Sequence, residues 1–422
     1  MRETIPEVTP HLRVGGREWR LPTALRALRH RNFRLYWFGQ LVSLTGTWMQ
    51  STAQQWLVYR LTGSPLALGA VMFLHSLPSM LFSLFAGVVV DRVDRRRFMA
   101  SLQVGMMTLA FILSALTFAG RVHYWHVLGM AFLLGLCNTF DQPTRHAFTL
   151  EISTKEDLPN AIALNSSMFN GARLIGPAVA GVIVASVGEA LAFLLNGLSF
   201  VAVIAGLLMM RLPPFTPKTG HLRPLADLAE GLRYIVKDRQ TLAQMVIVAV
   251  PSIFGFPIGT LVPVIAGQVL GLGADGYGVL VSAMGLGALA GAVTLAVLGS
   301  YRPRGRLLTV AMFVYALAGL GFALSWSVPL SMLALMLAGW GMITHLATTN
   351  TLLQLHLPDE LRGRVISAYL WVVVGLSPIG SLIFGSLAEA WGAPNAILMG
   401  ASVCLASALA TLVFLPQVRR ME

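Results

Sequence analysis

Charged residues are scarce in this chain. Only 11% of its 422 residues are charged, whereas soluble domains commonly carry about 25%. Acidic residues are the rarer kind, with 18 Asp and Glu against 30 Lys and Arg. The mean hydropathy of +0.71 agrees with this shortage of charge. Such a composition excludes an ordinary soluble fold and indicates a membrane protein.

Signals for redox, metal and nucleotide chemistry are also missing. The two cysteines, Cys137 and Cys404, both fall within apolar runs and form no C-x-x-C pair, so neither a disulfide nor a thiolate metal site has support. The histidines lack metal spacing, and the phosphate loop G-x-x-x-x-G-K-S/T does not occur, which argues against ATP-driven transport. We therefore expect no cofactor, no metal site and no catalytic residues, and the chain is not expected to be an enzyme.

Long apolar runs dominate what is present. A helix needs about 20 mostly apolar residues to cross the hydrocarbon core of a bilayer. Twelve segments meet this requirement, and they are 33–58, 66–90, 98–119, 124–147, 160–186, 190–210, 242–270, 276–299, 307–326, 329–356, 363–388 and 393–415. The sequence therefore predicts an all-α polytopic membrane protein with 12 transmembrane helices.

Positive charge is confined to alternate loops. The loops after the second, sixth, eighth and tenth spans are rich in arginine, whereas the odd-numbered loops hold almost no basic residue apart from Arg60 and Arg121. Loops rich in Lys and Arg stay in the cytoplasm. We therefore expect a multi-pass protein of the (inner) cell membrane, in contact with lipid and with both termini cytoplasmic. The net charge of +12 is then a topology signal, and nucleic acid is not an expected partner.

The spans divide into two sets of six. The predicted organisation is a cytoplasmic N-terminal segment over 1–32, a six-helix bundle over 33–211, a cytoplasmic linker over 212–241, a second six-helix bundle over 242–415 and a cytoplasmic tail over 416–422. Residues 22–32 read as a basic amphipathic helix on the inner leaflet. The pattern N-T-x-x-Q begins at Asn138 and again at Asn350. Parallel repeats joined by a basic linker are typical of secondary transporters with a midplane site.

The loop after the second span carries a motif. It reads G-V-V-V-D-R-V-D-R-R-R from Gly87 to Arg97 and resembles the G-x-x-x-D-R-x-G-R-R signature of the major facilitator superfamily, with Asp94 in place of the usual glycine. The opening L-R-H-R-N-F-R from Leu28 and the run A-R-L-I-G-P from Ala172 are similar to the enterobactin-exporter and macrolide-exporter branch. These resemblances span nearly the whole chain and imply the major facilitator fold in a monomeric exporter.

The resemblance also implies a role for the loop motif. It assigns a gating latch between the two halves, on the cytoplasmic face, to Gly87, Asp91, Arg92, Asp94 and Arg95. The residues alone allow a plainer interpretation, because arginines beside a membrane bind anionic lipid headgroups at about 1 kcal/mol each. We assign this anchoring role to the last two arginines of the motif.

Asp141 is the one acidic residue well inside a span. With Asn138, Gln142 and Arg145 it follows helical spacing and forms a polar stripe on the fourth span. A carboxyl group removed from water holds its proton more readily, so Asp141 is a candidate for exchanging a proton for the substrate. Arg145 lies one turn further on, in the favourable order for an ion pair, and a firmly paired Asp141 would carry no proton. Both interpretations stay open.

Arg173 lies near the middle of the fifth span, where an arginine needs a carboxylate, carbonyl groups or water. It is a candidate for attracting an anionic substrate, for tuning Asp141, or for tying the fourth and fifth spans together. Small residues that permit close helix packing surround it, and these are Gly171, Gly176, Pro177 and Gly181. The resemblance adds an antiporter-type hinge, which this glycine pattern matches only in part.

Uncharged polar and aromatic residues in several spans are candidates for lining a substrate cavity. They are Gln50, Gln54, Asn138, Gln142, Phe254 in the proline-broken seventh span, His345, Asn350, Gln354 and Trp371. Helix–helix hydrogen bonding or packing is the competing explanation for each of them. A lining of this kind suits an amphipathic cargo without naming it.

These patterns predict a secondary active exporter of amphipathic small molecules, such as a drug, a macrolide or a siderophore-like metabolite. Its mechanism would be proton antiport with alternating access, which makes a small-molecule substrate and protons its partners. Two other functions remain open. One is an uncoupled facilitator or importer of a small organic solute, and the other is a membrane sensor or binding protein that transports nothing.

Overall fold

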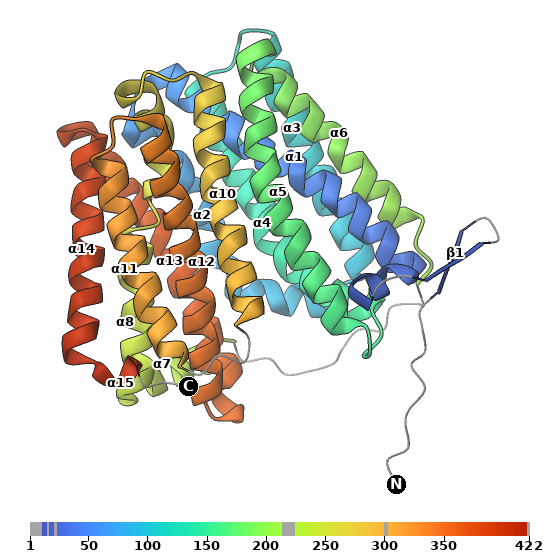
Figure 1. The fold of residues 1–422 in the computed structure, drawn as a ribbon. Coiled ribbons are helices and arrows are strands. Elements are labelled where there is room, and N and C mark those ends of the chain that lie inside the picture. Colours follow the sequence, from blue (N-terminus) through green and yellow to red (C-terminus); the bar gives the residue numbers. More distant parts are fainter. Residues whose placement is uncertain (1–10, 15–16, 21–22, 213–223, 299–302, 420–422) are drawn as a thin grey trace.

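The computed structural model of the chain describes residues 11–14, 17–20, 23–212, 224–298 and 303–419, and these are almost entirely helical (Figure 1). The predicted N-terminal segment, linker and tail lie partly outside the described residues. The helices are η1 (Thr23–Arg29), α1 (Arg31–Thr62), α2 (Pro65–Arg92), α3 (Arg95–Phe118), α4 (Tyr124–Ile152), α5 (Leu158–Val187), α6 (Glu189–Leu208), α7 (Pro224–Lys237), α8 (Arg239–Phe254), α9 (Ile258–Val264), η2 (Ile265–Val269), α10 (Ala274–Val297), α11 (Arg304–Ala323), α12 (Val328–His356), α13 (Asp359–Trp391), α14 (Ala393–Phe414) and α15 (Pro416–Arg419).

Two short strands precede the helices. β1 (His11–Val14) and β2 (Arg17–Arg20) pair antiparallel, with His11 opposite Arg20. They lie before the first predicted span, so this hairpin departs from the all-helical expectation only outside the predicted spans.

Each predicted span coincides with a helical segment. Among the described residues, ten of these segments are long and apolar enough to cross a membrane. The two others, α1 and α4, have 32 and 29 residues but hold more polar residues, so twelve crossings remain a prediction. The seventh span is divided into α8, α9 and the π-helix η2, and it contains Pro251, Pro257 and Pro263. Proline has no N–H to donate and interrupts a helix.

The two ends of the bundle differ in their loops. Five glycines with φ between 62° and 92° turn the chain at one end, which we call the glycine end, and they are Gly63, Gly120, Gly188, Gly271 and Gly392. Glycine adopts such φ values without strain. The other end, which we call the basic end, holds the arginine-rich α2–α3 loop. There Asp94 caps α3 by accepting from the N–H of Arg97 (3.1 Å).

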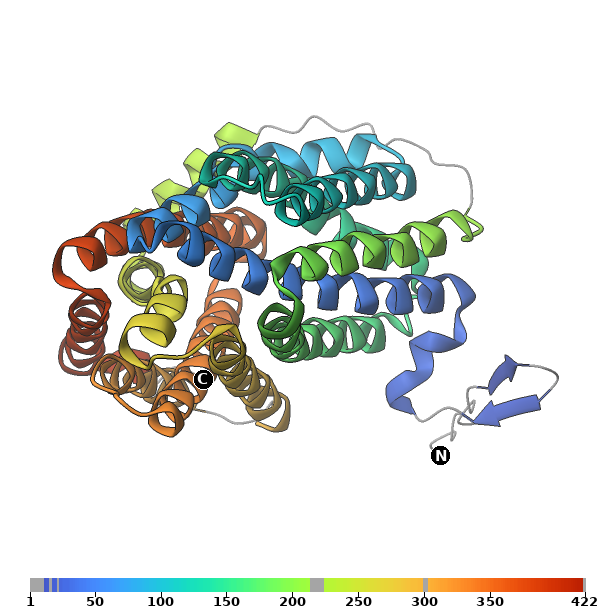
Figure 2. The same ribbon diagram turned by 90° about the horizontal axis from the view of Figure 1, so that it is seen from above.

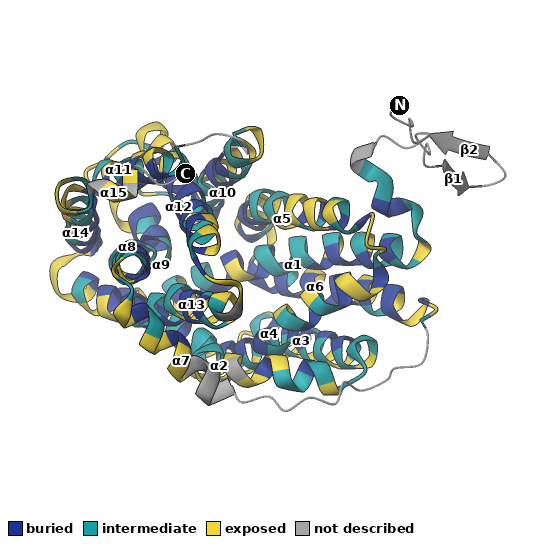
Figure 3. Ribbon diagram, turned by 90° about the horizontal axis from the view of Figure 1, so that it is seen from below, coloured by how far each residue is buried: buried dark blue, intermediate teal, exposed yellow. Residues whose placement is uncertain are grey.

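The helices form two groups that lie side by side (Figures 2 and 3). Helices α1–α6 pack together, α8–α14 pack together, and the pairs α2–α13 and α5–α10 join the groups. At the glycine end one apolar cluster includes both groups, with Leu57 and Val71 from the first and Tyr277 and Phe384 from the second. The other buried clusters each lie within one group. The groups are therefore joined at the glycine end, and Figure 1 shows α5 and α10 spreading apart toward the basic end.

Backbones of the two groups touch at the glycine end. Gly69 of α2 lies against the carbonyl oxygen of Ser381 in α13, where even a Cβ atom would collide. Close by, the carboxylate of Glu389 accepts hydrogen bonds from the Ser64 hydroxyl (2.7 Å) and the Leu66 N–H (3.3 Å). A carboxylate at a helix N-terminus is favourable, so Glu389 of α13 caps α2 across the groups.

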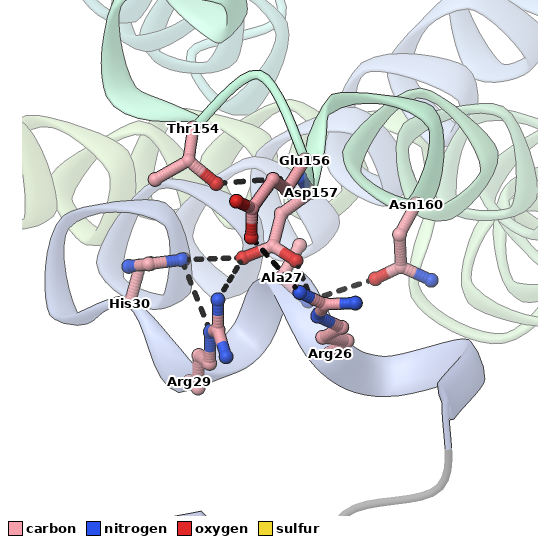
Figure 4. Close-up of polar contacts among 8 residues, drawn as sticks. All are labelled: Arg26, Ala27, Arg29, His30, Thr154, Glu156, Asp157 and Asn160. Atoms are coloured by element: carbon pink, nitrogen blue, oxygen red, sulfur yellow. Dashed lines mark hydrogen bonds and ion pairs between the residues drawn. The ribbon is translucent and has the colours of Figure 1, made fainter. Parts of the chain in front are cut away.

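The helix η1 is fixed to the α4–α5 loop by Asp157, whose side chain is fully buried (Figure 4). Its carboxylate contacts Arg26 Nε at 2.7 Å, Arg29 Nη2 at 2.8 Å and His30 Nε2 at 2.6 Å. The predicted basic helix over 22–32 is therefore a shorter 3-10 helix, and two of its arginines pair with a carboxylate. The position of this segment at the inner leaflet stays a prediction.

Asp157 lies outside the membrane-spanning helices and should stabilise the fold at neutral pH. Burial alone would raise its pKa, but the hydrogen bond from His30 and the charges of Arg29 and Arg26 outweigh burial and lower it. A carboxyl group with a lowered pKa stabilises the fold above its unfolded-state pKa of about 3.9, and this is lost as the pH falls through the folded-state value.

We therefore expect Asp157→Asn to destabilise the purified protein at pH 7 by about 1–3 kcal/mol, measured by thermal unfolding in detergent. The difference from wild type should shrink below about pH 4. The control is Glu156→Gln, because that carboxylate is 77% exposed and contacts Arg26 at 3.2 Å. Equal melting temperatures for Asp157→Asn and wild type at pH 7 would contradict a stabilising role for the Asp157 carboxylate.

The contact at Gly69 gives a second prediction. Gly69→Ala places a methyl group against the Ser381 carbonyl, and overpacking of this kind costs about 1–3 kcal/mol. The matched control is Gly129→Ala in α4, because nothing lies within 4 Å of a Cβ at that position, and helix propensity there favours alanine by about 1 kcal/mol. Thermal unfolding should separate the two variants, and equal stability would show that the close approach does not occur.

Candidate functional site

Asp141 is buried in α4 and has two partners. Arg145 donates to it from the next turn of the same helix, and Nε2 of Gln103 in α3 donates to Oδ1 at 2.8 Å. Gln103 is itself fully buried. The geometry therefore includes the ion pair that the spacing of Asp141 and Arg145 indicated.

The polar stripe on α4 points in more than one direction. Asp141 is 2% exposed and faces α3, whereas Gln142 is exposed and Asn138 is half-buried. Consecutive helical residues lie about 100° apart, which separates the carboxylate from its exposed neighbour. Gln103 was not among the predicted residues, although a lone glutamine inside an apolar run was a usable signal.

Arg173 in α5 has an aromatic neighbour. Its guanidinium carbon lies 5.7 Å from the centre of the Trp48 ring of α1, within the range of a cation–π interaction. Trp48 in turn meets Phe169 edge to face, with ring centres 5.7 Å apart. Within the part of the chain that the structure describes, Arg173 forms no ion pair with Asp141 or with another carboxylate.

The predicted small residues of α5 have separate contacts. Gly176 lies against α1, where a Cβ would stand 2.6 Å from Cβ of Trp48. Gly181 faces α10, with a Cβ position 3.1 Å from Cα of Gly278, and Gly278 in turn approaches the carbonyl of Pro177. A Cβ on Gly171 would meet nothing within 4 Å. Close packing thus accounts for three of the four residues.

The loop motif forms its ion pairs within the first group. Asp91 pairs with Arg95 at 3.0 Å, and Arg95 also contacts Glu151 at the end of α4 at 3.2 Å. Asp94 caps α3, Arg92 is exposed, and a Cβ on Gly87 would meet open space. Among the described residues, no ion pair links this motif to the second group.

The last two arginines of the motif behave differently from each other. Arg96 donates to the carbonyl oxygens of Met210 and Leu208 at 3.1 Å each, which satisfies backbone groups at the end of α6. The side chain of Arg97 is 89% exposed. Lipid anchoring stays an expectation for Arg97, whereas Arg96 has a protein partner that its sequence position did not reveal.

Several cavity candidates lie within helix interfaces. Gln50 accepts from Nδ2 of Asn196 at 2.7 Å between α1 and α6, and Gln54 is buried one turn further on. Phe254 packs edge to face on Phe384, with ring centres 6.1 Å apart. His345 is 3% exposed. These contacts agree with the packing interpretation.

The other candidates are accessible. Gln354 is exposed and donates to Asn350 one turn earlier in α12. Trp371 is 38% exposed, and its Nε1 donates to the carbonyl of Met80 at 3.3 Å, which links α13 to α2. These residues and Gln142 are therefore the accessible members of the predicted cavity lining.

The described residues contain no group of three or more His, Cys, Asp or Glu side chains that could hold a metal ion. Cys137 and Cys404 are both free thiols. The polar chemistry of the site is therefore that of an ion pair buried between α4 and α3 of the first group, a guanidinium beside two aromatic rings, and neutral hydrogen-bonding side chains.

The chain is similar to known transporters. The staphyloferrin A transporter of Staphylococcus aureus is 24% identical, over 82% of this chain and 87% of its own length. Macrolide efflux protein A of Streptococcus pyogenes is 23% identical, over 89% and 94%. The multidrug efflux pump Tap of Mycolicibacterium fortuitum is 26% identical, over 91% and 96%.

Solved structures share the fold. A bacterial homologue of the human lysosomal transporter Spinster superposes with a TM-score of 0.73 at 11% identity, over 93% of this chain and 97% of that one. The nucleoside transporter NupG gives 0.68 at 12% identity, over 94% and 99%.

The family comparison covers almost the whole chain. Residues 22–422 match the family described as transmembrane secretion effector. The relatives and fold neighbours described above are transporters and not enzymes. The long apolar helices agree with a multi-pass membrane protein. This chain therefore belongs to the transmembrane secretion effector family of the major facilitator superfamily.

Proposed function

We propose that the chain is a secondary exporter of amphipathic small molecules that works by alternating access. The observation that carries this proposal is the division of the apolar core, which both groups share at the glycine end and which is separate in each group elsewhere. If the two groups rock against each other, the shared cluster opens while the basic end closes. A site at the membrane midplane then becomes accessible from the other side of the membrane. Relatives named for siderophore, macrolide and multidrug transport support an organic cargo.

The basic end faces the cytoplasm in this proposal. Arginine-rich loops stay inside, and the loop with Arg92, Arg95, Arg96 and Arg97 is at that end. Helices η1 and α15 lie at the same end (Figure 1). The arrangement of the groups then corresponds to an inward-facing state, which would take cargo from the cytoplasm or the inner leaflet.

Proton antiport through Asp141 is the second part of the proposal. An antiporter that takes a proton from outside must release it while its site faces the cytoplasm. Asp141 accepts hydrogen bonds from Arg145 and Gln103 in this arrangement, which we assign to the released state. Protonation in the opposite state would need Arg145 to move away from the carboxylate. A pair that couples transport to protons makes this movement, whereas a purely structural pair stays in place.

The loop motif acts as the inner gate in this scheme. Its ion pairs now hold the α2–α3 loop to the end of α4, and the exposed Arg92 is available to contact the second group once the basic end closes. The cargo would leave from the glycine end, and closure at the motif would then prevent a leak.

We expect Asp141→Asn to abolish proton-linked transport. Asparagine keeps the size of the side chain and an oxygen that accepts from Gln103, but it carries no proton. In everted vesicles with an inside-acid gradient, a cargo from a panel of cationic drugs, macrolides and catecholate siderophores should dissipate the gradient for wild type, read with a pH-sensitive dye. The variant should leave the gradient intact.

The control for this experiment is Asp359→Asn, because that carboxylate is 82% exposed and pairs with Arg362 at the basic end. If Asp141→Asn dissipates the gradient as wild type does, Asp141 has no part in coupling. Flux that continues after the gradient has been collapsed would instead favour an uncoupled facilitator. Binding without any flux would favour a sensor.

A further inference from the structure

We infer that the cargo is an organic anion and that Arg173 binds its negative charge beside the rings of Trp48 and Phe169. The inference rests on the proposed transport function and names the class of substrate. Its first support is the charge balance inside the membrane-spanning helices. Among the described helices, only Asp141, Arg145 and Arg173 are charged residues lying about two turns or more from both helix ends.

Two of these three charges cancel each other. Asp141 is bound by Arg145, so it offers little attraction for a cationic cargo. Arg173 has no carboxylate partner among the described residues, and its guanidinium lies beside the Trp48 ring. A guanidinium has five N–H donors, and an unpaired charge inside the membrane is costly. One net positive charge is therefore available for an anion that arrives with the cargo.

The position of Arg173 is between the groups. Its carbonyl oxygen lies 2.8 Å from a Cβ position on Gly285 of α10, so this turn of α5 faces the second group. Trp48 lies two turns before Gln55 on α1, and Gln55 accepts from the Tyr277 hydroxyl of the second group at 3.3 Å. Residues two turns apart share a helix face, so Trp48 points toward the same junction.

The aromatic rings define the rest of the ligand. Trp48 is half-buried and Phe169 is 43% exposed. Their edge-to-face arrangement gives an apolar wall beside the guanidinium. A flat apolar body that carries a carboxylate or a similar anionic group would contact both features at once, which matches an amphipathic organic anion.

An anionic lipid headgroup has the same chemistry as such a cargo. Arg173 is near the middle of the 30-residue helix α5, which places it about 20 Å from either helix end at 1.5 Å per residue. Headgroups lie at the membrane surfaces, so the depth of Arg173 favours a cargo that enters between the groups.

The test uses three probes of nearly equal shape and different charge: 1-naphthoate, 1-naphthamide and 1-naphthylmethylammonium. Binding to the full-length protein in phosphatidylcholine nanodiscs should be about tenfold tighter for the anion than for the amide, because a hydrogen bond to a charged group contributes at least this factor. Arg173→Gln should remove the preference, and Arg173→Lys should keep part of it. Arg97→Gln is the control, since that side chain is 89% exposed.

The outcomes separate the possible sources of the anion. If nanodiscs with phosphatidylglycerol abolish naphthoate binding, a lipid headgroup occupies Arg173 and the cargo assignment is wrong. Equal affinities for the three probes, a preference for the cation, or no binding of any probe would also overturn it. Gradient dissipation by a neutral or cationic drug that is unaffected by Arg173→Gln would leave the exporter proposal standing while the anion assignment falls.

Discussion

Water is absent from the hydrocarbon core of a bilayer, and a polar group placed there must find its partner within the protein. This constraint explains why nearly every buried polar side chain with a described partner joins two helices or two turns. Asp141 is held by Gln103 and Arg145, and Gln50 by Asn196. Asp141 and Gln50 thus have structural contacts within the bundle, whereas Gln142 and Gln354 are exposed.

The joint between the groups relies on small residues and apolar surface. Gly69, Gly181 and Gly278 bring backbones of the two groups into direct contact, and the shared cluster around Tyr277 adds apolar area. Glu389 contributes a polar contact at the rim of this joint. Among the described residues this interface has few ion pairs to break, which is suited to a joint that must open and close again.

Bilayer thickness made the helices predictable. It fixes the length of a span, so the predicted 276–299 corresponds to α10 at Ala274–Val297. The pair of Asp141 with Arg145 followed from their spacing within one helix. The N-terminal hairpin was not anticipated, because its segment carries no periodic pattern that distinguishes strand from loop.

Contacts between distant segments could not be derived from the sequence. Asp157 binds Arg29 across 128 positions and Gln103 reaches Asp141 across 38, and helix periodicity places no constraint on such pairs. The same reason explains why Gln50 was expected to line a cavity and why Gly171 was expected to pack. A side chain's face is predictable from spacing, whereas the neighbour opposite that face depends on the arrangement of all the helices.

Distances between spin labels on α5 and α10 test the rocking of the two groups most directly. The native cysteines are first replaced. One label pair at the basic end then substitutes Ile162 and Val297, and a second pair at the glycine end substitutes Val187 and Asp275. All four positions are exposed. On addition of a transported cargo or a proton gradient, the account predicts a shorter distance at the basic end and a longer one at the glycine end. Distances that stay constant at both ends, or change in the same direction, would contradict alternating access.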